Sequence, residues 1–477
     1  MYAATTSAAL VGGDVRPVEV QVHVGRQNDR FKLSGLPDTA VREAKDRVRA
    51  AVMSSGVQFP NRTVTVNLAP AHLPKSGTDF DLPIALGVLA ASKEIPHPGR
   101  VVAVGELALD GSVRSGASTI GAAVLSARLG VPCLVSSGAA GEVAAVPGSR
   151  VHGVASLAQA VDLLRNGLEG QVAAEATYQE EPRTSADLAD VKGQHLARRA
   201  IEIAAAGGHH VLLHGPPGGG KTMLARRLPG ILPPLSDDEA VEVALVHAAA
   251  GLRRGLSRAR PFRSPHHTAS RAALVGGGSG VAVPGEVSLA HRGVLFVDEM
   301  AEFPRANLDT LRQPLEDGVV TVARRGVTAT FPSMFHLVAA TNPCPCGYRG
   351  DRRKPCECRP AVVARYRQRV SGPLLDRFDL VVNVDRLEAD DATGPEPDSS
   401  AEVRRRVAGA HKRLADGTPE LDEDANALLM AALRNSLLTA RGVDRVRRVA
   451  TTICALADAD RVAEEHVAEA MGLRVDW

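Results

Sequence analysis

Alternating apolar positions near the start of the chain predict two β-strands. In "PVEVQVHV", residues 17–24, every second residue is valine, and "RTVTVNLA", residues 62–69, repeats the alternation. Between these segments the apolar residues follow helical spacing, which predicts one helix that Asp38 caps and Gly56 ends. The first part of the chain is therefore predicted to be mixed α/β.

An Asp-Gly turn in "GELALDGSVRS", residues 105–115, predicts a short β-hairpin, and an alanine-rich helix is expected at 117–129. Periodicity is lost at 166–188, where charged and small polar residues dominate, as is typical of a linker. These patterns predict an N-terminal domain over residues 1–165, followed by a linker.

Helices and short apolar strands alternate from residue 189 to 390, which is typical of the parallel sheet of an ATPase core. Residues 391–477 contain four helical patterns and predict a small C-terminal domain. The predicted fold class is an α/β multidomain protein with an α/β N-terminal domain, a P-loop core with a parallel sheet, and a helical C-terminal lid. A chain of 477 residues is long enough for three such domains.

The composition limits the partners that the chain can have. With 56 basic and 54 acidic residues, it has no overall charge that would attract nucleic acid, so a basic surface must be local. No apolar run reaches the roughly 18 residues of a membrane span, and the N-terminus lacks a signal-peptide pattern. Six cysteines are too few for a disulfide framework. We therefore expect a cytoplasmic protein with no membrane partner.

A glycine-rich loop between an apolar strand and a helix predicts an ATP site. The stretch "VLLHGPPGGGKTML", residues 211–224, contains the pattern G-x-x-x-x-G-K-T. In this pattern backbone N–H groups surround the phosphates, the lysine supplies positive charge, and the threonine hydroxyl binds Mg²⁺. A chance match to the pattern is the alternative, but a chance match would not be expected to have an apolar strand before it and a helix after it, as this stretch has. The predicted binding residues are Gly215, Pro216, Pro217, Gly218, Gly219, Gly220, Lys221 and Thr222.

Two later strands end in the polar groups that such a site needs. In "GVLFVDEM", residues 293–300, the apolar run is followed by Asp298 and Glu299. Asp298 is predicted to hold Mg²⁺ with Thr222, and Glu299 is predicted to polarise the attacking water. The strand predicted in "FHLVAATNP", residues 335–343, leads to Asn342, which can orient the same water.

Two arginines complete the predicted catalytic set. Arg377, in "SGPLLDRFDL", lies between acids, where a surface ion pair is the ordinary interpretation. It can also reach the γ-phosphate bound by a neighbouring subunit, as an arginine finger does, and the site is then complete only in an oligomer. Arg441 opens a helix of the C-terminal domain and can approach the phosphates from that side.

The order of these motifs resembles AAA+ ATPases of the magnesium-chelatase-like group, and longer stretches closely resemble the ComM/YifB family. These stretches are "DLADVKGQHLARRAIEIAAAGGHHVLLHGPPGGGKT", "PFRSPHHTASRAALVGGG", "PGEVSLAHRGVLFVDEMAEF" and "RVSGPLLDRFDL". The resemblance implies a Lon-protease-like N-terminal domain, an AAA+ core and a helical C-terminal domain. It also implies a hexameric helicase that drives branch migration in homologous recombination or natural transformation.

The same resemblance assigns a role to each motif residue. Lys221 and Thr222 match Walker A, Asp298 and Glu299 Walker B, Asn342 sensor 1, Arg377 the arginine finger, Arg441 sensor 2, and residues 190–194 the segment beside adenine. Gly219 departs from the family pattern, in which serine or threonine is more usual at this position.

Peptidase activity is not expected of the Lon-like domain. The stretch "LPKSGTDFDLPIALGVL", residues 73–89, keeps a Pro-Lys-x-Gly turn but has no serine where Lon-type peptidases carry their nucleophile. Ser76 precedes the glycine, and Ile120 takes the place of the lysine base. Without this pair nothing activates the attack, so a structural or partner-binding role is predicted, with DNA as one possible partner.

Two basic segments are predicted to face the pore of such a ring. Residues 252–271 are rich in arginine and contain two histidines, although a solvated insertion with ion pairs is the alternative. "LEDGVVTVARRGVTATFPSMF", residues 315–335, predicts a β-hairpin with Arg324 and Arg325 at its tip, where contact with DNA is expected.

Four of the six cysteines lie within "ATNPCPCGYRGDRRKPCECRP", residues 340–360, directly after Asn342. Four thiolates can fill the tetrahedral shell of Zn²⁺, and the polar loop over 344–358 has no apolar core of its own. A structural zinc is therefore predicted, with reversible disulfides and an iron–sulfur site as alternatives. The predicted ligands are Cys344, Cys346, Cys356 and Cys358.

The predicted function is an ATP-dependent DNA motor that forms a ring, requires Mg²⁺ and binds ATP between subunits. One alternative is an AAA+ ATPase that remodels a protein partner, as in magnesium chelatase. Another is a regulatory or chaperone ATPase that binds proteins through its N-terminal domain and never contacts DNA.

Overall fold

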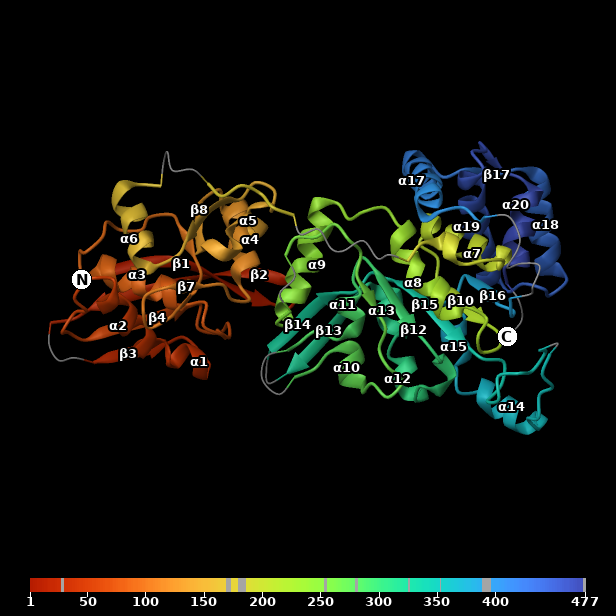
Figure 1. Ribbon diagram of the computed structural model, residues 1–477, viewed down its shortest axis with the longest axis horizontal. Helices are drawn as coiled ribbons and strands as arrows, with labels where there is room; N and C mark the ends of the chain where they lie inside the picture. The colour runs from red at the N-terminus through yellow and green to blue at the C-terminus, as the bar shows by residue number, and fades with distance from the viewer. Residues whose placement is uncertain are drawn as a thin grey trace.

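The structure is a computed structural model that describes residues 1–26, 30–168, 173–178, 186–252, 255–278, 282–324, 327–351, 353–387 and 396–474. Figure 1 shows the N-terminal region at one end of the long axis, a second α/β region beside it, and the C-terminal helices at the far end. The α/β fold class with a parallel-strand core is confirmed.

Residues 2–154 form a seven-stranded mixed sheet in the order β3-β4-β2-β1-β5-β8-β9, with a separate β6–β7 hairpin. The two alternating segments lie on β2 and β4, which pair antiparallel, and the valines of β2 are buried. The strands are β1 (Tyr2–Val11), β2 (Asp14–Val24), β3 (Phe31–Ser34), β4 (Val64–Ala69), β5 (Val102–Ala103), β6 (Glu106–Leu107), β7 (Val113–Arg114), β8 (Pro132–Ser136) and β9 (Arg150–Val154). The helices are α1 (Thr39–Arg42), α2 (Ala44–Ser54), α3 (Asp81–Ala91), α4 (Thr119–Leu129), α5 (Ser137–Ala144) and α6 (Leu157–Asn166).

The single helix expected after Asp38 is instead two helices, α1 and α2, which meet at Glu43. Asp38 caps the first of them, as predicted, by accepting a hydrogen bond from the N–H of Val41. The guanidinium of Arg47 donates to the Ala40 carbonyl, which a continuous helix would pair with the N–H of residue 44. The carbonyl thus has a side-chain partner where the helix is interrupted.

The second region contains a five-stranded parallel sheet in the order β11-β12-β15-β10-β16 and the separate hairpin β13–β14. Its strands are β10 (Val211–His214), β11 (Phe262–Arg263), β12 (Val294–Val297), β13 (Val319–Arg324), β14 (Val327–Pro332), β15 (His336–Thr341) and β16 (Leu380–Asn383). Its helices are η1 (Leu188–Asp190), α7 (His195–Gly207), α8 (Lys221–Ile231), α9 (Asp237–Ala249), α10 (Arg271–Val275), α11 (Glu286–Leu289), η2 (Met300–Glu302), α12 (Arg305–Asp309), α13 (Arg312–Asp317), α14 (Pro360–Arg367) and α15 (Gly372–Leu375).

The C-terminal part contains the four predicted helices and one strand pair that the sequence did not predict. These elements are α17 (Ser400–Asp416), β17 (Glu420–Leu421), α18 (Glu423–Arg434), α19 (Ala440–Leu456), β18 (Arg461–Val462) and α20 (Glu464–Gly472). Their apolar faces join the faces of α7, α8 and β10 in one buried cluster. The helical lid and the sheet of the second region therefore share a hydrophobic core.

Within the described residues, no helix combines the length and the apolar character that crossing a membrane requires.

Candidate nucleotide-binding site

The glycine-rich loop joins the carboxyl end of β10 to the amino end of α8, as the motif predicts. Glycine is required at residue 215 because a Cβ atom there would lie 2.1 Å from the Val384 carbonyl oxygen. Gly218 and Gly220 have φ angles of +82° and +92°, which side chains rarely adopt. The loop therefore turns tightly at the amino end of α8, where backbone N–H groups favour an anion.

Gly219 has its own packing reason. A Cβ atom at this position would lie 2.7 Å from the Val384 carbonyl oxygen and 3.0 Å from that of Asp385. The backbone that follows β16 approaches the loop too closely for the serine or threonine that is more usual there. Thus the departure from the family pattern matches a close backbone contact in this chain.

Lys221 is buried at the centre of the loop. Its ammonium group donates to the carbonyl oxygens of Gly215 and Pro216 at 2.6 and 2.8 Å and to the Asn342 side-chain oxygen at 3.1 Å. Burial lowers the pKa of Lys221 to about 8. A phosphate at this position would give the buried ammonium group a negatively charged partner.

The acidic end of β12 faces the same point. The hydroxyl of Thr222 donates to an oxygen of Asp298 at 2.9 Å, so two oxygen ligands suited to Mg²⁺ lie side by side. The other Asp298 oxygen accepts the backbone N–H of Glu299 at 2.9 Å. Glu299 has a φ angle of +49°, in the left-handed region, and its side chain is 56% exposed. The parallel order β12-β15-β10 brings Asp298, Asn342 and Lys221 to one edge of the sheet.

His267 lies beside Glu299, although nothing in the sequence pattern connects the two residues. Its Nδ1 atom is 3.4 Å from a carboxylate oxygen of Glu299. The His267 ring lies 4.1 Å from the ring of His266 and meets Phe303 edge-on. His267 belongs to the arginine-rich segment 252–271, so this segment reaches the acidic end of β12.

Three arginines of that segment, Arg258, Arg260 and Arg263, support the ion-pair interpretation. Arg258 pairs with Asp237 at 2.6 Å, and Arg263 forms a bidentate pair with Glu286. Arg260 donates to backbone carbonyls of Pro233 and Arg292. Residues 253 and 254 lie outside the described part of the chain.

Gln194 joins the segment expected beside adenine to the loop. Its side-chain amide donates to the carbonyl oxygen of Gly219 at 3.2 Å and to that of Asp385 at 2.5 Å. Arg227 of α8 donates to the Asp187 carbonyl and pairs with Asp190 at 2.7 Å. Residues 187–194 therefore border the glycine-rich loop.

Arg377 and Arg441 lie together, at the edge of the sheet opposite to Lys221. Arg377 precedes β16, whereas the glycine-rich loop follows β10, and these two strands are parallel neighbours. Both arginines line a cavity of about 320 Å³, together with Arg445, Arg448, Asp376 and Asp379. Arg377 forms an ion pair with Glu316. In this structure, therefore, both arginines lie on the side of the sheet away from the glycine-rich loop.

Asp379 anchors one side of this cavity. It is buried, accepts the backbone N–H of His210 at 3.2 Å and pairs with Arg448 at 2.7 Å. Burial alone would raise the pKa of Asp379, but the hydrogen bond and charge of His209 and the charge of Arg448 lower it to about 2.

The four cysteines of the loop 344–358 form one cluster. All four sulfur atoms lie within 4.8 Å of one another, and the sulfur of Cys344 is 3.3 Å from that of Cys346 and 3.6 Å from that of Cys356. Tetrahedral zinc with sulfur at about 2.3 Å needs sulfur atoms about 3.8 Å apart, so the donors fit this ion. Gly347 lies against the glycine-rich loop, because a Cβ atom on it would be 2.7 Å from Cδ of Pro217.

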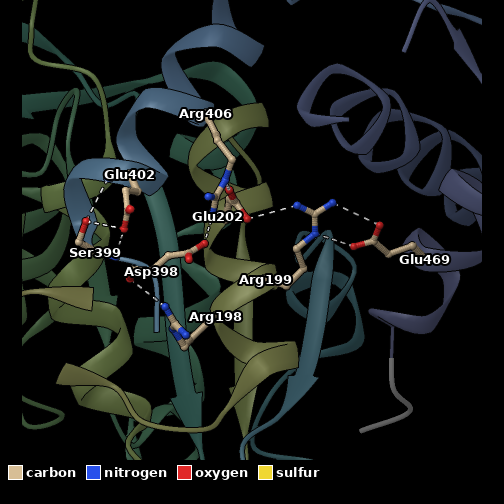
Figure 2. Close-up of polar contacts among 8 residues, drawn as sticks. All are labelled: Arg198, Arg199, Glu202, Asp398, Ser399, Glu402, Arg406 and Glu469. Atoms are coloured by element: carbon tan, nitrogen blue, oxygen red, sulfur yellow. Dashed lines mark hydrogen bonds and ion pairs between the residues drawn. The ribbon is translucent and has the colours of Figure 1, made fainter. Parts of the chain in front are cut away.

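A charged network fastens the lid to α7 (Figure 2). Glu202 of α7 is buried and accepts hydrogen bonds from Arg199 at 3.2 Å and from Arg406 of α17 at 2.5 Å. Arg199 also pairs with Glu469 of α20 at 2.8 Å, and Arg406 pairs with Asp398 at 2.8 Å. Glu202 and the arginines beside it thus link two lid helices, α17 and α20, to α7. Helix α7 is the helix that follows residues 187–194.

The predicted hairpin is present as β13 and β14, paired in register from Val319 with Pro332 to Arg324 with Val327. Its inner face, with Val320, Val322 and Phe331, packs into a cluster shared with β12 and β15. Arg325 and the side chain of Arg324 lie outside the residues that the structure describes.

Family profiles match three successive parts of the chain. The profile "Magnesium chelatase, subunit ChlI" matches residues 187–392, "Subunit ChlI of Mg-chelatase" matches 18–137, and "Magnesium chelatase, subunit ChlI C-terminal" matches 397–474. The competence protein ComM of Haemophilus influenzae is 39% identical over 98% of this chain and 96% of its own length. The protein YifB of Escherichia coli is 41% identical over the same shares of the two chains. The chain belongs to the ComM/YifB family of magnesium-chelatase-like proteins.

A more distant similarity covers a smaller share of the chain. The DNA replication licensing factor MCM7 of Arabidopsis thaliana is 25% identical over 40% of this chain and 29% of its own length. Family membership and this similarity make the chain a ComM-like ATPase of the AAA+ type, whose substrate is ATP with Mg²⁺.

The structure also describes the residues that were compared with the serine–lysine pair of Lon-type peptidases. Ser76 is exposed, Lys75 is buried and donates to the Pro70 carbonyl, and Ile120 is buried on α4. Asp79 is buried and accepts the backbone N–H of Ser118 at 2.7 Å. The carboxylate of Asp79 thus contacts the backbone at the amino end of α4.

Proposed function

We propose that this protein is an ATP-dependent DNA motor that works as a ring, expected to be hexameric, in homologous recombination or natural transformation. The observation that carries the proposal is the separation of the site into two halves. Lys221, Asp298 and Asn342 lie at the carboxyl edge of the parallel sheet, and Arg377 and Arg441 at the amino edge. The two halves would form one complete site if the carboxyl edge of the sheet in one subunit met the amino edge in the next.

In the proposed site, the glycine-rich loop and Lys221 hold the β- and γ-phosphates. Thr222 and Asp298 would hold Mg²⁺, which would supply positive charge against the negative charge of the phosphates. Glu299 accepts a proton from the attacking water, and Asn342 orients that water. The hydrogen bond between Lys221 and Asn342 supports a shared site, because it holds these two groups in contact.

Arg377 and Arg441 are proposed to complete the site of the neighbouring subunit. Both line a common cavity with Arg445 and Arg448, in which Asp376, Asp379 and Asp444 are the acidic neighbours. An arginine supplied across an interface stabilises the charge of the transferring phosphoryl group and makes hydrolysis depend on assembly. The Glu316 carboxylate is the partner that Arg377 exchanges for phosphate when subunits meet.

The cysteine cluster is proposed to hold a structural Zn²⁺. Four protein ligands leave no open position for catalysis, so the ion would only fix the loop. The contact of Gly347 with Pro217 supports a role in supporting the glycine-rich loop. Cys344, two residues after Asn342, would fix the end of β15 in the same way.

DNA is the proposed substrate of the motor. The hairpin β13–β14 directly precedes β15, and Asn342 follows the end of β15, so a force on the hairpin tip would reach the hydrolysis site through a short connection. Arg324 and Arg325 at the tip would contact DNA phosphates, the contact that supplies most non-specific affinity. The names of two relatives, a competence protein and a DNA replication licensing factor, favour a nucleic-acid substrate over the protein partner of a chelatase.

The test is DNA binding by a double variant, Arg324→Glu with Arg325→Glu, measured at two salt concentrations. We expect loss of DNA binding with unchanged ATP binding, because the substitutions remove proposed contacts with DNA phosphates and leave every predicted nucleotide-binding residue in place. The matched control, Arg42→Glu with Lys45→Glu, changes the net charge equally on an exposed surface of α1 and α2. Equal DNA binding by wild type and hairpin variant would remove the hairpin from the account. No DNA binding by any form would favour a protein-remodelling ATPase.

A further inference from the structure

The N-terminal region contacts the base of the β13–β14 hairpin directly. A two-residue turn, Gly12-Gly13, joins β1 to β2, and the N–H of Gly13 donates to the Thr330 carbonyl of β14 at 2.9 Å. A Cβ atom on Gly12 would lie 2.4 Å from the Thr330 oxygen, and one on Gly13 would lie 2.5 Å from Cδ of Pro332. The turn therefore approaches β14 as closely as two backbones can, and only glycine allows this approach.

A buried apolar contact accompanies this hydrogen bond. Val15 of β2 and Ile120 of α4 share one hydrophobic cluster with Val243 and Ala244 of α9. Figure 1 shows α9 and β14 at the border between the N-terminal region and the ATPase core. The contact is thus a packed interface between the two regions, with α9 as its centre.

Residues before α9 in the chain also cross this border. The N–H of Thr177 donates to the Gly141 carbonyl of α5 at 2.8 Å. The hydroxyl of the next residue, Tyr178, donates to Asp237 at the start of α9 at 3.2 Å, and Arg258 lies over its ring. The predicted linker therefore adds polar contacts at the same interface, where the structure describes it.

The other side of this interface leads to the hydrolysis site. Glu242 of α9 pairs with Arg292 at 2.9 Å and with His291 at 3.1 Å, directly before β12. The N–H of Met334, which follows β14, donates to His291 at 3.1 Å. One set of contacts therefore joins the N-terminal region, the base of the hairpin and the strand that carries Asp298.

We propose that the N-terminal region is a brace for the β13–β14 hairpin, with the Gly12-Gly13 turn as its positioning element. This proposal deepens the proposed DNA motor and rests on it for the load at the hairpin tip. The turn holds the base of the hairpin against α9, so that force on the tip moves β12 and β15 and does not merely bend the hairpin. The interface gives the N-terminal region a mechanical role that needs no peptidase chemistry.

The test uses Gly13→Ala in the full-length chain. Gly13 does not need a positive φ angle, so alanine adds only the clash with Pro332. Gly25→Ala is the matched control, since a Cβ atom there, just after β2, would meet atoms no closer than 3.5 Å. Pro332→Ala removes the atom that the new methyl group would meet, so Gly13→Ala should have no further effect in that background.

Hydrogen exchange of the β13–β14 amides is the first measurement. We expect Gly13→Ala to speed exchange there by about fivefold or more, the change that follows loss of one hydrogen bond. Gly25→Ala should leave exchange unchanged, and Gly13→Ala with Pro332→Ala should match Pro332→Ala alone. Equal exchange in Gly13→Ala and Gly25→Ala, or an unrescued double variant, would overturn the brace.

DNA-stimulated ATP hydrolysis is the second measurement. Gly13→Ala should reduce the stimulation severalfold and leave nucleotide affinity unchanged, whereas Gly25→Ala should behave as wild type. Full stimulation in Gly13→Ala, despite faster exchange in the hairpin, would also overturn the brace. If wild type itself shows no stimulation by DNA, the proposed motor fails, and the exchange result alone then decides the structural part of the inference.

Discussion

Replacing Asp379 by asparagine should loosen the cavity that holds Arg377 and Arg441. The carboxylate is buried and its pKa is lowered from the ordinary 3.8 to about 2. This difference corresponds to about 2 kcal/mol of stabilisation at neutral pH. Arg448 and the His210 N–H donate to different oxygens of Asp379. Asparagine keeps an acceptor for only one of these donors and removes the charge, so most of this contribution should be lost.

The sign of the pH dependence follows from the lowered pKa. A carboxylate whose pKa is lower in the folded state contributes stability above its unfolded pKa, and this contribution disappears as the pH falls toward the folded pKa. The difference between wild type and Asp379→Asn should therefore be full at pH 7 and should shrink between pH 3.8 and about 2.

Hydrogen exchange of the β16 amides is the assay, because a multidomain chain does not unfold in a single step. At pH 7, Asp379→Asn should speed exchange in β16 by about 30-fold, the equivalent of 2 kcal/mol. The matched control is Asp376→Asn in the same cavity, where a half-exposed carboxylate lies 3.6 Å from Arg445 and should contribute little. Equal exchange in the two variants would refute the electrostatic account of this cavity.

Three further predictions concern the active site. Treatment with a chelator, or the substitution Cys346→Ser, should lower zinc content and weaken nucleotide binding by about tenfold or more, because Gly347 supports Pro217. The control Cys133→Ala, outside the cluster, should change neither quantity. Unaltered nucleotide affinity after complete zinc loss would contradict the supporting role. His267→Ala should lower kcat by about tenfold with little change in KM, since His267 lies beside Glu299; an unchanged kcat would leave His267 without a role. Mixing Lys221→Ala with Arg377→Ala, each inactive alone, should restore part of the ATPase activity at interfaces that combine an intact loop with an intact arginine, and no recovery on mixing would argue against a shared site.

The nucleotide site could be predicted from the sequence because each of its parts is local. A P-loop carries its own strand, turn and helix, and the strands ending at Asp298 and Asn342 carry apolar runs that need a parallel sheet. The alternation in β2 and β4 and the cap at Asp38 are equally local. The roles of the site residues remain predictions that the experiments above address.

The remaining features depend on contacts between distant parts of the chain. His267 and Glu299 are brought together by the fold, and the contact of Gly13 with Thr330 joins residues more than three hundred positions apart. The sequence alone shows only that Gly219 departs from the family pattern, whereas in the structure the backbone of residues 384 and 385 leaves no room for a side chain there. The β17–β18 pair was missed because strands of two residues carry no periodic signal.

The most direct test of the proposed motor is steady-state ATP hydrolysis by the purified protein, alone and with single-stranded, duplex and branched DNA. The account predicts strong stimulation by DNA that is lost in Glu299→Gln, while this variant still binds ATP. A rate that no DNA changes, with nucleotide binding intact, would contradict the DNA motor and direct attention to a protein partner.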